Sequence, residues 1–75
     1  MKTFSDLIFK EHPSTFGGGF SEMTFENGYS IVVFGGSYNG YEVEIIDPNG
    51  YPIKNMIKNA DEKKITELME EAQKL

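Results

Sequence analysis

The sequence predicts an α+β fold: a four-stranded antiparallel β-meander with a C-terminal α-helix packed on one face. Between residues 20 and 55, apolar and polar side chains alternate, and glycine-containing turns interrupt the alternation at 27–28, 37–40 and 47–50. This pattern is typical of antiparallel hairpins with one buried face. After residue 60 the apolar residues take the spacing of a helix.

The chain has 75 residues and no cysteine, so one small domain without disulfide bonds or thiolate metal sites is expected. The predicted parts of this domain are an N-terminal arm (1–19), an antiparallel sheet (20–55) and a helix (60–75). No apolar run approaches the roughly 20 residues that cross a bilayer, and the N-terminus lacks the features of a signal peptide. We therefore expect a soluble cytoplasmic protein that has no cofactor and does not contact a membrane.

The net charge of −5 is unevenly distributed. Residues 1–53 hold seven acids and two lysines, whereas residues 54–75 hold five of each. Arginine, the usual residue for bidentate contacts to phosphates and bases, is absent, so direct nucleic-acid binding is not expected. The acidic excess favours a partner with a basic surface, and its simplest alternative role is to keep a small protein soluble.

Asn27-Gly28 is the strongest local signal, because both central positions of a type I′ turn need φ > 0 and this dipeptide tolerates that best. A two-residue loop makes Glu26 face Tyr29. Directly opposed residues share a face. One face then receives the apolar side chains Met23, Phe25, Val32 and Phe34. The other face receives Glu22, Thr24, Glu26, Tyr29, Ile31 and Val33.

The next turn, at 37–40, is interpreted as a four-residue loop that pairs Gly36 with Tyr41. Its register agrees with the alternation in 41–45, and a one-residue slip would reverse every side chain. The strand adds two residues to the apolar face and two to the other face: Val43 with Ile45, and Glu42 with Glu44, respectively.

The third turn, at 47–50, has proline where φ near −65° is wanted and glycine where a left-handed residue is wanted. A three-residue loop places Tyr51 and Ile53 on the apolar face, opposite Asp47 and Ile45 respectively. Because Pro52 has no backbone N–H, residues 51–55 are predicted to form an edge strand.

The C-terminal segment carries one helical stripe: Ile65, Leu68, Met69, Ala72 and Leu75. Asn59 followed by Glu62 suggests a capping box at its start. A helix of about 14 residues is marginal alone, so the stripe is expected to dock on the apolar sheet face. The N-terminal arm is interpreted as a short strand or an irregular segment packed on the core.

The second sheet face is the candidate functional site, because its apolar residues are interleaved with carboxylates. An apolar centre with a charged rim is common in protein interfaces. The predicted protein-binding residues are Glu22, Glu26, Tyr29, Ile31, Val33, Tyr38, Glu42 and Glu44. Two alternatives remain open at this point: the N-terminal arm folds over this face, or the face mediates self-association.

The sequence does not favour an enzyme. His12 is the only histidine, and it is more typical of a turn residue beside Pro13 than of a general base. The glycine clusters at 17–19 and 35–36 lack the Lys-Ser/Thr of a phosphate-binding loop. A flat sheet offers no cleft for paired-carboxylate hydrolysis, and no dedicated calcium loop supports a divalent-cation site. No catalytic residue and no metal site are therefore predicted.

A series of short motifs resembles a group of small acidic bacteriophage proteins. The motifs lie between residues 7 and 75: His12-Pro13, Gly17-Gly18, Phe25, Asn27-Gly28-Tyr29, Val32-Val33, Gly36-Ser37-Tyr38 and Tyr41-Glu42-Val43. Members of that group also end in an acidic helix. They usually have glycine where this chain has Ser30, a departure that indicates either looser packing on the predicted inner face or a register different from the predicted one.

The resemblance implies a phage accessory protein that binds and inhibits a host protein in the bacterial cytoplasm. Anti-CRISPR and anti-restriction inhibitors act in this way, and their targets include nucleic-acid enzymes and defence factors with basic grooves. In this reading the glutamates steer the partner, and Tyr29, Ile31 and Tyr38 anchor it. The alternative is a homo-oligomeric structural or virion-assembly protein. We expect a monomer or a weak homodimer.

Overall fold

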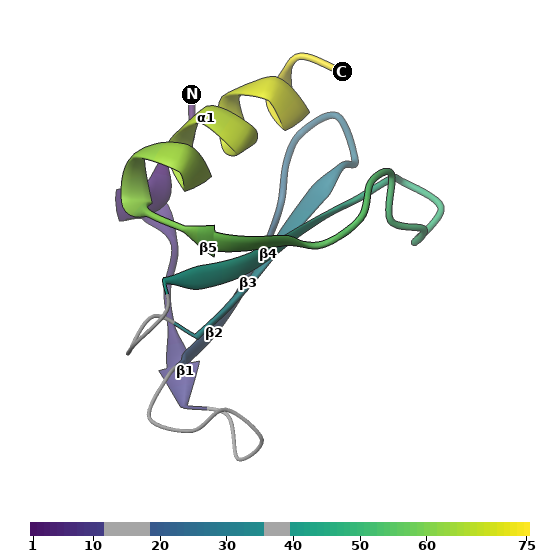
Figure 1. The fold of residues 1–75 in the computed structure, drawn as a ribbon. Helices are drawn as coiled ribbons and strands as arrows, with labels where there is room; N and C mark the ends of the chain where they lie inside the picture. The colour runs from purple at the N-terminus through teal and green to yellow at the C-terminus, as the bar shows by residue number, and fades with distance from the viewer. Residues whose placement is uncertain (12–18, 36–39) are drawn as a thin grey trace.

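The computed structural model describes residues 1–11, 19–35 and 40–75. In it, an antiparallel sheet of five strands carries one α-helix on a single face (Figure 1). The strands lie side by side in chain order. The elements are η1 (Phe4–Asp6), β1 (Lys10–Glu11), β2 (Gly19–Thr24), β3 (Ser30–Gly35), β4 (Tyr41–Ile46), β5 (Ile57–Ala60) and α1 (Glu62–Gln73).

The predicted α+β class and the antiparallel meander are confirmed, and the predicted strand number is wrong by one. The additional strand is β1, a two-residue strand within the N-terminal arm. The outer edge opposite β1 is β5, which begins after the segment predicted as the edge strand. Within 51–55, Pro52 forms a single bridge with Ile46, and the chain then leaves the sheet before returning as β5.

The turn between β2 and β3 contains three residues, and this changes the predicted register. The Phe25 N–H donates to the Tyr29 carbonyl at 2.7 Å, and the Gly28 N–H donates to the Phe25 carbonyl at 3.0 Å. Gly28 has a φ of 90°, whereas Asn27 does not have the positive φ that a type I′ turn requires. The arrangement is a type I turn closed by a left-handed glycine. The predicted pairing of Glu26 with Tyr29 was therefore wrong.

The one-residue shift turns β3 over. Met23 now lies opposite Ile31, and Ile31 lies opposite Ile45. Ile31 and Val33 consequently face the helix, where both are 0% exposed. Val32 and Phe34 face the other side. On the far side of β3 the pairing is also shifted, with Gly35 opposite Tyr41, so β4 keeps its predicted faces.

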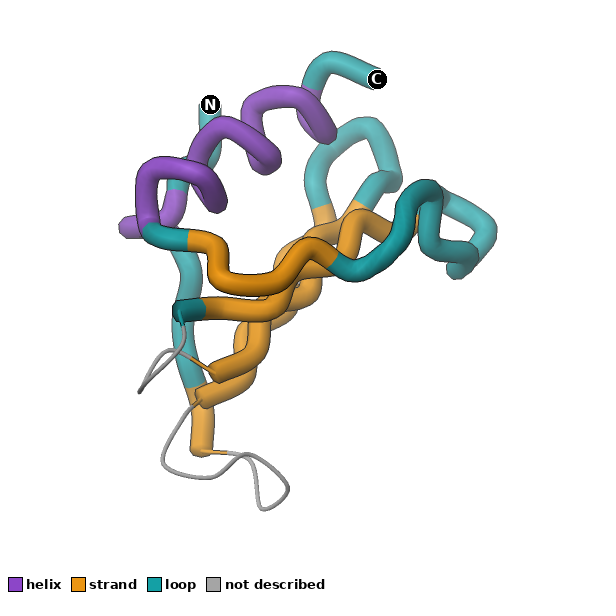
Figure 2. The backbone as a smooth tube through the Cα atoms, viewed as in Figure 1, coloured by secondary structure: helices purple, strands orange, loops and turns teal. Residues whose placement is uncertain are grey.

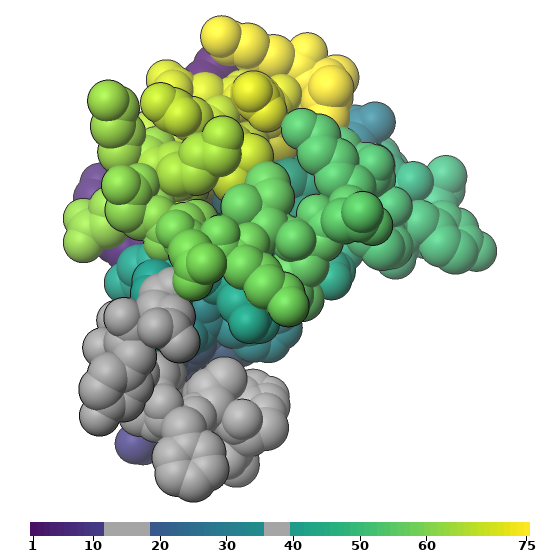
Figure 3. Space-filling view, in the orientation of Figure 1, coloured from purple at the N-terminus to yellow at the C-terminus, as the bar shows by residue number. Residues whose placement is uncertain are grey.

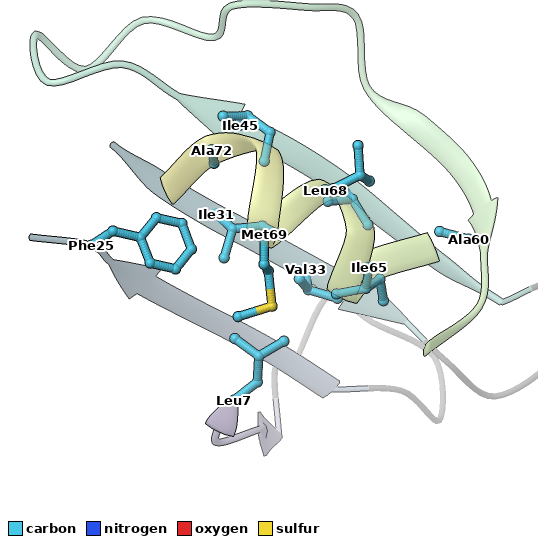
Figure 4. Close-up of a cluster of buried hydrophobic side chains, with 11 residues drawn as sticks. Leu7, Phe25, Ile31, Val33, Ile45, Ala60, Ile65, Leu68, Met69 and Ala72 are labelled. Atoms are coloured by element: carbon cyan, nitrogen blue, oxygen red, sulfur yellow. The ribbon is translucent and has the colours of Figure 1, made fainter. Parts of the chain in front are cut away.

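The core lies between the sheet and α1 (Figure 4). The helical stripe of Ile65, Leu68, Met69 and Ala72 is buried as predicted, while Leu75 at the end of the chain is exposed. The stripe packs in one buried cluster with side chains from the sheet and the arm: Leu7, Phe25, Ile31, Val33, Val43, Ile45 and Ala60. Ser21 occupies a core-face position opposite Val33, and its buried hydroxyl has no partner among the described residues.

Side chains from outside the helix cap both of its ends. Asp61 is the N-cap, and its Oδ1 accepts the Lys64 N–H at 2.7 Å. The predicted cap at Asn59 was wrong, because Asn59 lies in β5 with a φ of 59°. At the other end, the Asn27 side-chain amide donates to the Ala72 carbonyl at 2.8 Å and to the Leu75 carbonyl at 3.2 Å. The first turn is thereby attached to the end of α1.

The described part of the N-terminal arm packs on the helix side of the sheet (Figure 2). The Lys2 N–H donates to the Gln73 side chain at 2.8 Å, and the Phe4 N–H donates to the Thr66 hydroxyl at 3.1 Å. The Phe4 and Phe9 rings pack against Tyr41, with centroids 5.4 and 5.6 Å away. Within residues 1–11 the arm therefore does not cover the face that carries Val32 and Phe34.

The turn at 47–50 has the predicted three-residue loop. The Asp47 N–H donates to the Tyr51 carbonyl at 2.7 Å, and the Ile53 N–H donates to the Ile45 carbonyl at 3.0 Å. The predicted register is thus confirmed here. Tyr51 and Ile53 are nevertheless exposed, because this hairpin extends away from α1 (Figure 1).

Adjacent valines on opposite faces of β3 test the register. We predict that Val33→Ala lowers the free energy of unfolding by about 2–3 kcal/mol, because it leaves a cavity in the core. Val32→Ala should cost less than about 1 kcal/mol, because Val32 lies on the other face. Both changes alter strand propensity equally. The difference between the two variants in the free energy of unfolding, measured by urea denaturation, therefore reports the effect of burial. A larger loss of stability for Val32→Ala than for Val33→Ala would show that Val32 is the buried residue, and would support the two-residue turn.

The contact between the first turn and the helix end is also testable. We predict that Asn27→Ala lowers the free energy of unfolding by about 1–2 kcal/mol, because the Ala72 and Leu75 carbonyls and the Tyr29 N–H lose their hydrogen bonds to the Asn27 side chain. Asn49→Ala is the matched control, since Asn49 occupies the same place in the three-residue turn at 48–50 and its side chain bonds to no described residue. Equal losses in thermal unfolding of the two variants would contradict the proposed cap.

Candidate functional site: the outer sheet face

The outer sheet face is the side of the sheet opposite α1. Three strands supply its side chains: Phe20, Glu22 and Thr24 from β2, Ser30, Val32 and Phe34 from β3, and Glu42, Glu44 and Ile46 from β4. Lys10 of β1 lies beside Phe20 at one edge. Both described helical elements, η1 and α1, lie on the core side (Figure 1). Within the described ranges, neither helix covers this face.

The outer sheet face has an apolar centre on its middle strand. Val32 and Phe34 are both half-buried, and the Phe34 ring packs against Phe20 with centroids 5.3 Å apart. Glu22 lies beside Val32 on β2, and Glu44 lies beside Val32 on β4. Glu42 lies beside Phe34. Carboxylates therefore border the apolar residues of the central strand on both sides.

These carboxylates are not neutralised within the described part of the chain. The ion pair that forms there joins Lys54 to Glu71 at 3.7 Å, and Glu22, Glu42 and Glu44 take part in none. Glu22 and Glu42 are exposed, and Glu44 is half-buried between its neighbours. The face thus presents unpaired negative charge next to apolar surface, which is the composition of a protein-binding patch with a charged rim.

The structure separates the predicted site residues into three groups. Glu22, Glu42 and Glu44 lie together on the outer sheet face, as expected. Ile31 and Val33 belong to the core, and Tyr29 is half-buried against it, so these predicted protein-binding residues were placed on the wrong face. Tyr38 lies outside the described residues, as does His12.

Glu26 is displaced from the other three glutamates because it lies in the turn. It lines an open pocket of about 550 Å³ with Lys2, Asp6 and Gln73. Two of the polar side chains there are already engaged: Asp6 accepts the Thr3 N–H at 2.8 Å, and the Gln73 amide bonds to the Lys2 backbone. This pocket contains no arrangement of nucleophile and base.

Val32 and Phe34 are the apolar residues of the outer sheet face that the sequence prediction placed on the core face. The signal that could have identified them is the repetition of Asn-Gly-Tyr, which occurs at 27–29, 39–41 and 49–51. The turn that contains the last of these was predicted with three residues, and the turn that contains the first has the same geometry, with φ of 90° at Gly28 and 91° at Gly50. Treating the two turns alike would have placed Val32 and Phe34 outside.

Other kinds of site were sought in the same residues. Nowhere in 1–11, 19–35 and 40–75 do three acidic or histidine side chains gather closely enough to hold a metal ion. No helix in those ranges is long and apolar enough to span a membrane. On the side of the molecule seen in Figure 3, α1 and the segment around β5 form a continuous surface.

Comparison with known proteins adds no family. No protein-family model, curated protein sequence or solved structure matches this chain. The resemblance to small bacteriophage proteins therefore stays a prediction.

Proposed function

We propose that this chain is a small acidic accessory protein of phage type that binds and inhibits a host protein through its outer sheet face. The observation that supports this proposal is the apolar strip of Val32 and Phe34 between unpaired glutamates. Such a face matches a basic surface with apolar residues at its centre. A nucleic-acid enzyme or a defence factor of the host cytoplasm offers that combination, so an anti-CRISPR or anti-restriction role is the specific form of the proposal.

The roles of the residues differ from those expected from the sequence alone. Val32 and Phe34 replace Tyr29 and Ile31 as the anchors, because Ile31 is buried and Tyr29 is half-buried against the core. Glu22, Glu42 and Glu44 keep the steering role. Truncation of an anchor should mainly accelerate dissociation, whereas loss of a rim carboxylate should mainly slow association and reduce its salt dependence.

The alternative, a homo-oligomeric structural or virion-assembly protein, has weaker support. Pairing two outer sheet faces would bring like charges together. The described edges are also poor templates for strand addition, because β1 has two residues and β5 pairs irregularly with β4. A monomer or a weak homodimer remains the expected state.

Affinity capture from bacterial lysates tests the proposal with two variants of equal charge. The first variant combines Glu22→Gln, Glu42→Gln and Glu44→Gln on the outer sheet face. The control combines Glu62→Gln, Glu67→Gln and Glu70→Gln on the exposed side of α1. We predict that a host protein retained by the wild type and the control is captured about tenfold less by the first variant, a loss of about 1.4 kcal/mol.

The captured protein should also be released as the salt concentration rises, since exposed charges are screened. Its activity should fall when the purified wild-type chain is added. Equal thermal unfolding of both variants would show that the difference is not caused by misfolding. Undiminished capture by the outer-face variant would refute the proposed surface.

A further inference from the structure

The composition of β3 indicates that its outer side, like its inner side, packs against another layer. Residues 31–34 form an unbroken apolar run, Ile-Val-Val-Phe. Runs of this kind are typical of strands covered on both faces, whereas a strand with one wet face alternates. Ile31 and Val33 are covered by α1. Val32 and Phe34 have no equivalent cover among the described residues.

The occupant of the outer sheet face must satisfy its own backbone hydrogen bonds. The face of a sheet presents side chains, since its backbone N–H and C=O groups are engaged between strands. An extended segment laid on this face would leave its own N–H and C=O groups unpaired. An α-helix has no such cost, because its backbone groups are paired internally.

The spacing of the rows also fits a helix. Glu22 and Glu44 lie on either side of Val32, so their backbones are about 9.5 Å apart, two strand spacings. A helix with its side chains is about 10–12 Å across. A helix lying over β3 therefore has Glu22 along one flank and Glu42 and Glu44 along the other. Val32 and Phe34 are about 6.6 Å apart along the strand, close to one helical turn.

The charge of the rim determines the charge of the occupant. Three carboxylates border the apolar strip, and the register places Lys10 on the same face at the β1 edge and Lys58 beside Glu42 at the β5 edge. A helix with lysine or arginine on both sides of an apolar stripe would pair with these carboxylates. An acidic helix would be repelled, and a uniformly apolar helix would leave the carboxylates unpaired.

From these observations we propose that the outer sheet face binds a basic amphipathic α-helix of the partner protein. The bound helix forms a third layer, so that the sheet is sandwiched between it and α1. Its apolar stripe lies over Val32 and Phe34, and its flanking cations reach Glu22 on one side and Glu44 on the other. The inference deepens the proposed function and rests on it.

Titration with synthetic peptides tests the inference directly. The probe is a leucine–lysine peptide of about 18 residues with leucines on one helical face, long enough to form a helix on binding. One control peptide has the same composition in scrambled order, and a second has glutamate in place of lysine. We predict that the first peptide binds and becomes helical by circular dichroism, and that neither control binds.

The adjacent valines show where the peptide lies. Intermolecular nuclear Overhauser effects should connect peptide leucine methyls to the Val32 methyls and the Phe34 ring. The Val33 methyls should show none, because they are buried against α1. Contacts to α1, or equal binding of the scrambled peptide, would overturn the inference.

Two variants measure the contributions of the apolar strip and the rim. Phe34→Ala should raise the dissociation constant about tenfold, as expected for an interface anchor. The double variant Glu22→Gln with Glu44→Gln retains the apolar strip and should raise the dissociation constant several-fold at low salt. The double variant Glu67→Gln with Glu70→Gln on α1 should bind as the wild type does. An unchanged dissociation constant for the variant with Glu22→Gln and Glu44→Gln would show that the bound helix does not need cations along its flanks.

Failure of this inference can be distinguished from failure of the proposed function. If the peptide leaves Val32 unperturbed while the outer-face variant still loses its captured host protein, the occupant is not a basic helix and the proposed function stands. If the outer-face variant captures the host protein undiminished, the proposed function fails whatever the peptide does.

Discussion

The conformation of the turn at 26–28 controls the arrangement of the whole molecule. A left-handed Gly28 closes a three-residue loop and fixes the pairing of β2 with β3. Because side chains alternate along a strand, this pairing decides whether Ile31 and Val33 or Val32 and Phe34 enter the core. The same turn directs the Asn27 amide to the end of α1. Register, core composition and helix attachment thus depend on one turn.

Much of the fold could be predicted from the sequence because several signals were independent of that turn. The stripe of Ile65, Leu68, Met69 and Ala72 has helical spacing, and the alternation in 41–45 fixes the faces of β4. The turn at 47–50 contains Pro48, which has no N–H to donate to Tyr51 as a two-residue Asn49-Gly50 turn requires, so the three-residue form was favoured.

The first turn could not be decided from local sequence, for a physical reason. Asn-Gly suits a two-residue type I′ turn, and it equally suits the last two positions of a three-residue loop. Periodicity usually resolves such a choice, but 31–34 is apolar at every position, so either face of β3 could have been buried. The irregular edge strand β5 could not be predicted from local sequence either. The left-handed conformation of Asn59 and the helix cap at Asp61 both depend on how β5 meets α1.

The same ambiguity explains why the candidate site was predicted only in part. Glu22, Glu42 and Glu44 lie on strands whose faces were predicted correctly, because the two register shifts on either side of β3 cancel. Val32 and Phe34 lie on β3 itself, so the predicted register exchanged their face with that of Ile31 and Val33. A strand that is apolar on both sides, with one helix on its inner face and carboxylates bordering its outer face, is the feature from which the proposed binding surface follows.

Nuclear Overhauser effects between α-protons across the first hairpin test the central claim most directly. Residues opposite one another in non-hydrogen-bonded antiparallel pairs have their Cα atoms about 4.5 Å apart, which brings their α-protons into contact. The three-residue turn predicts strong α-proton contacts between Thr24 and Ser30 and between Glu22 and Val32. Strong contacts of Val32 with Met23, or of Ser30 with Phe25, would show the two-residue turn and contradict the account.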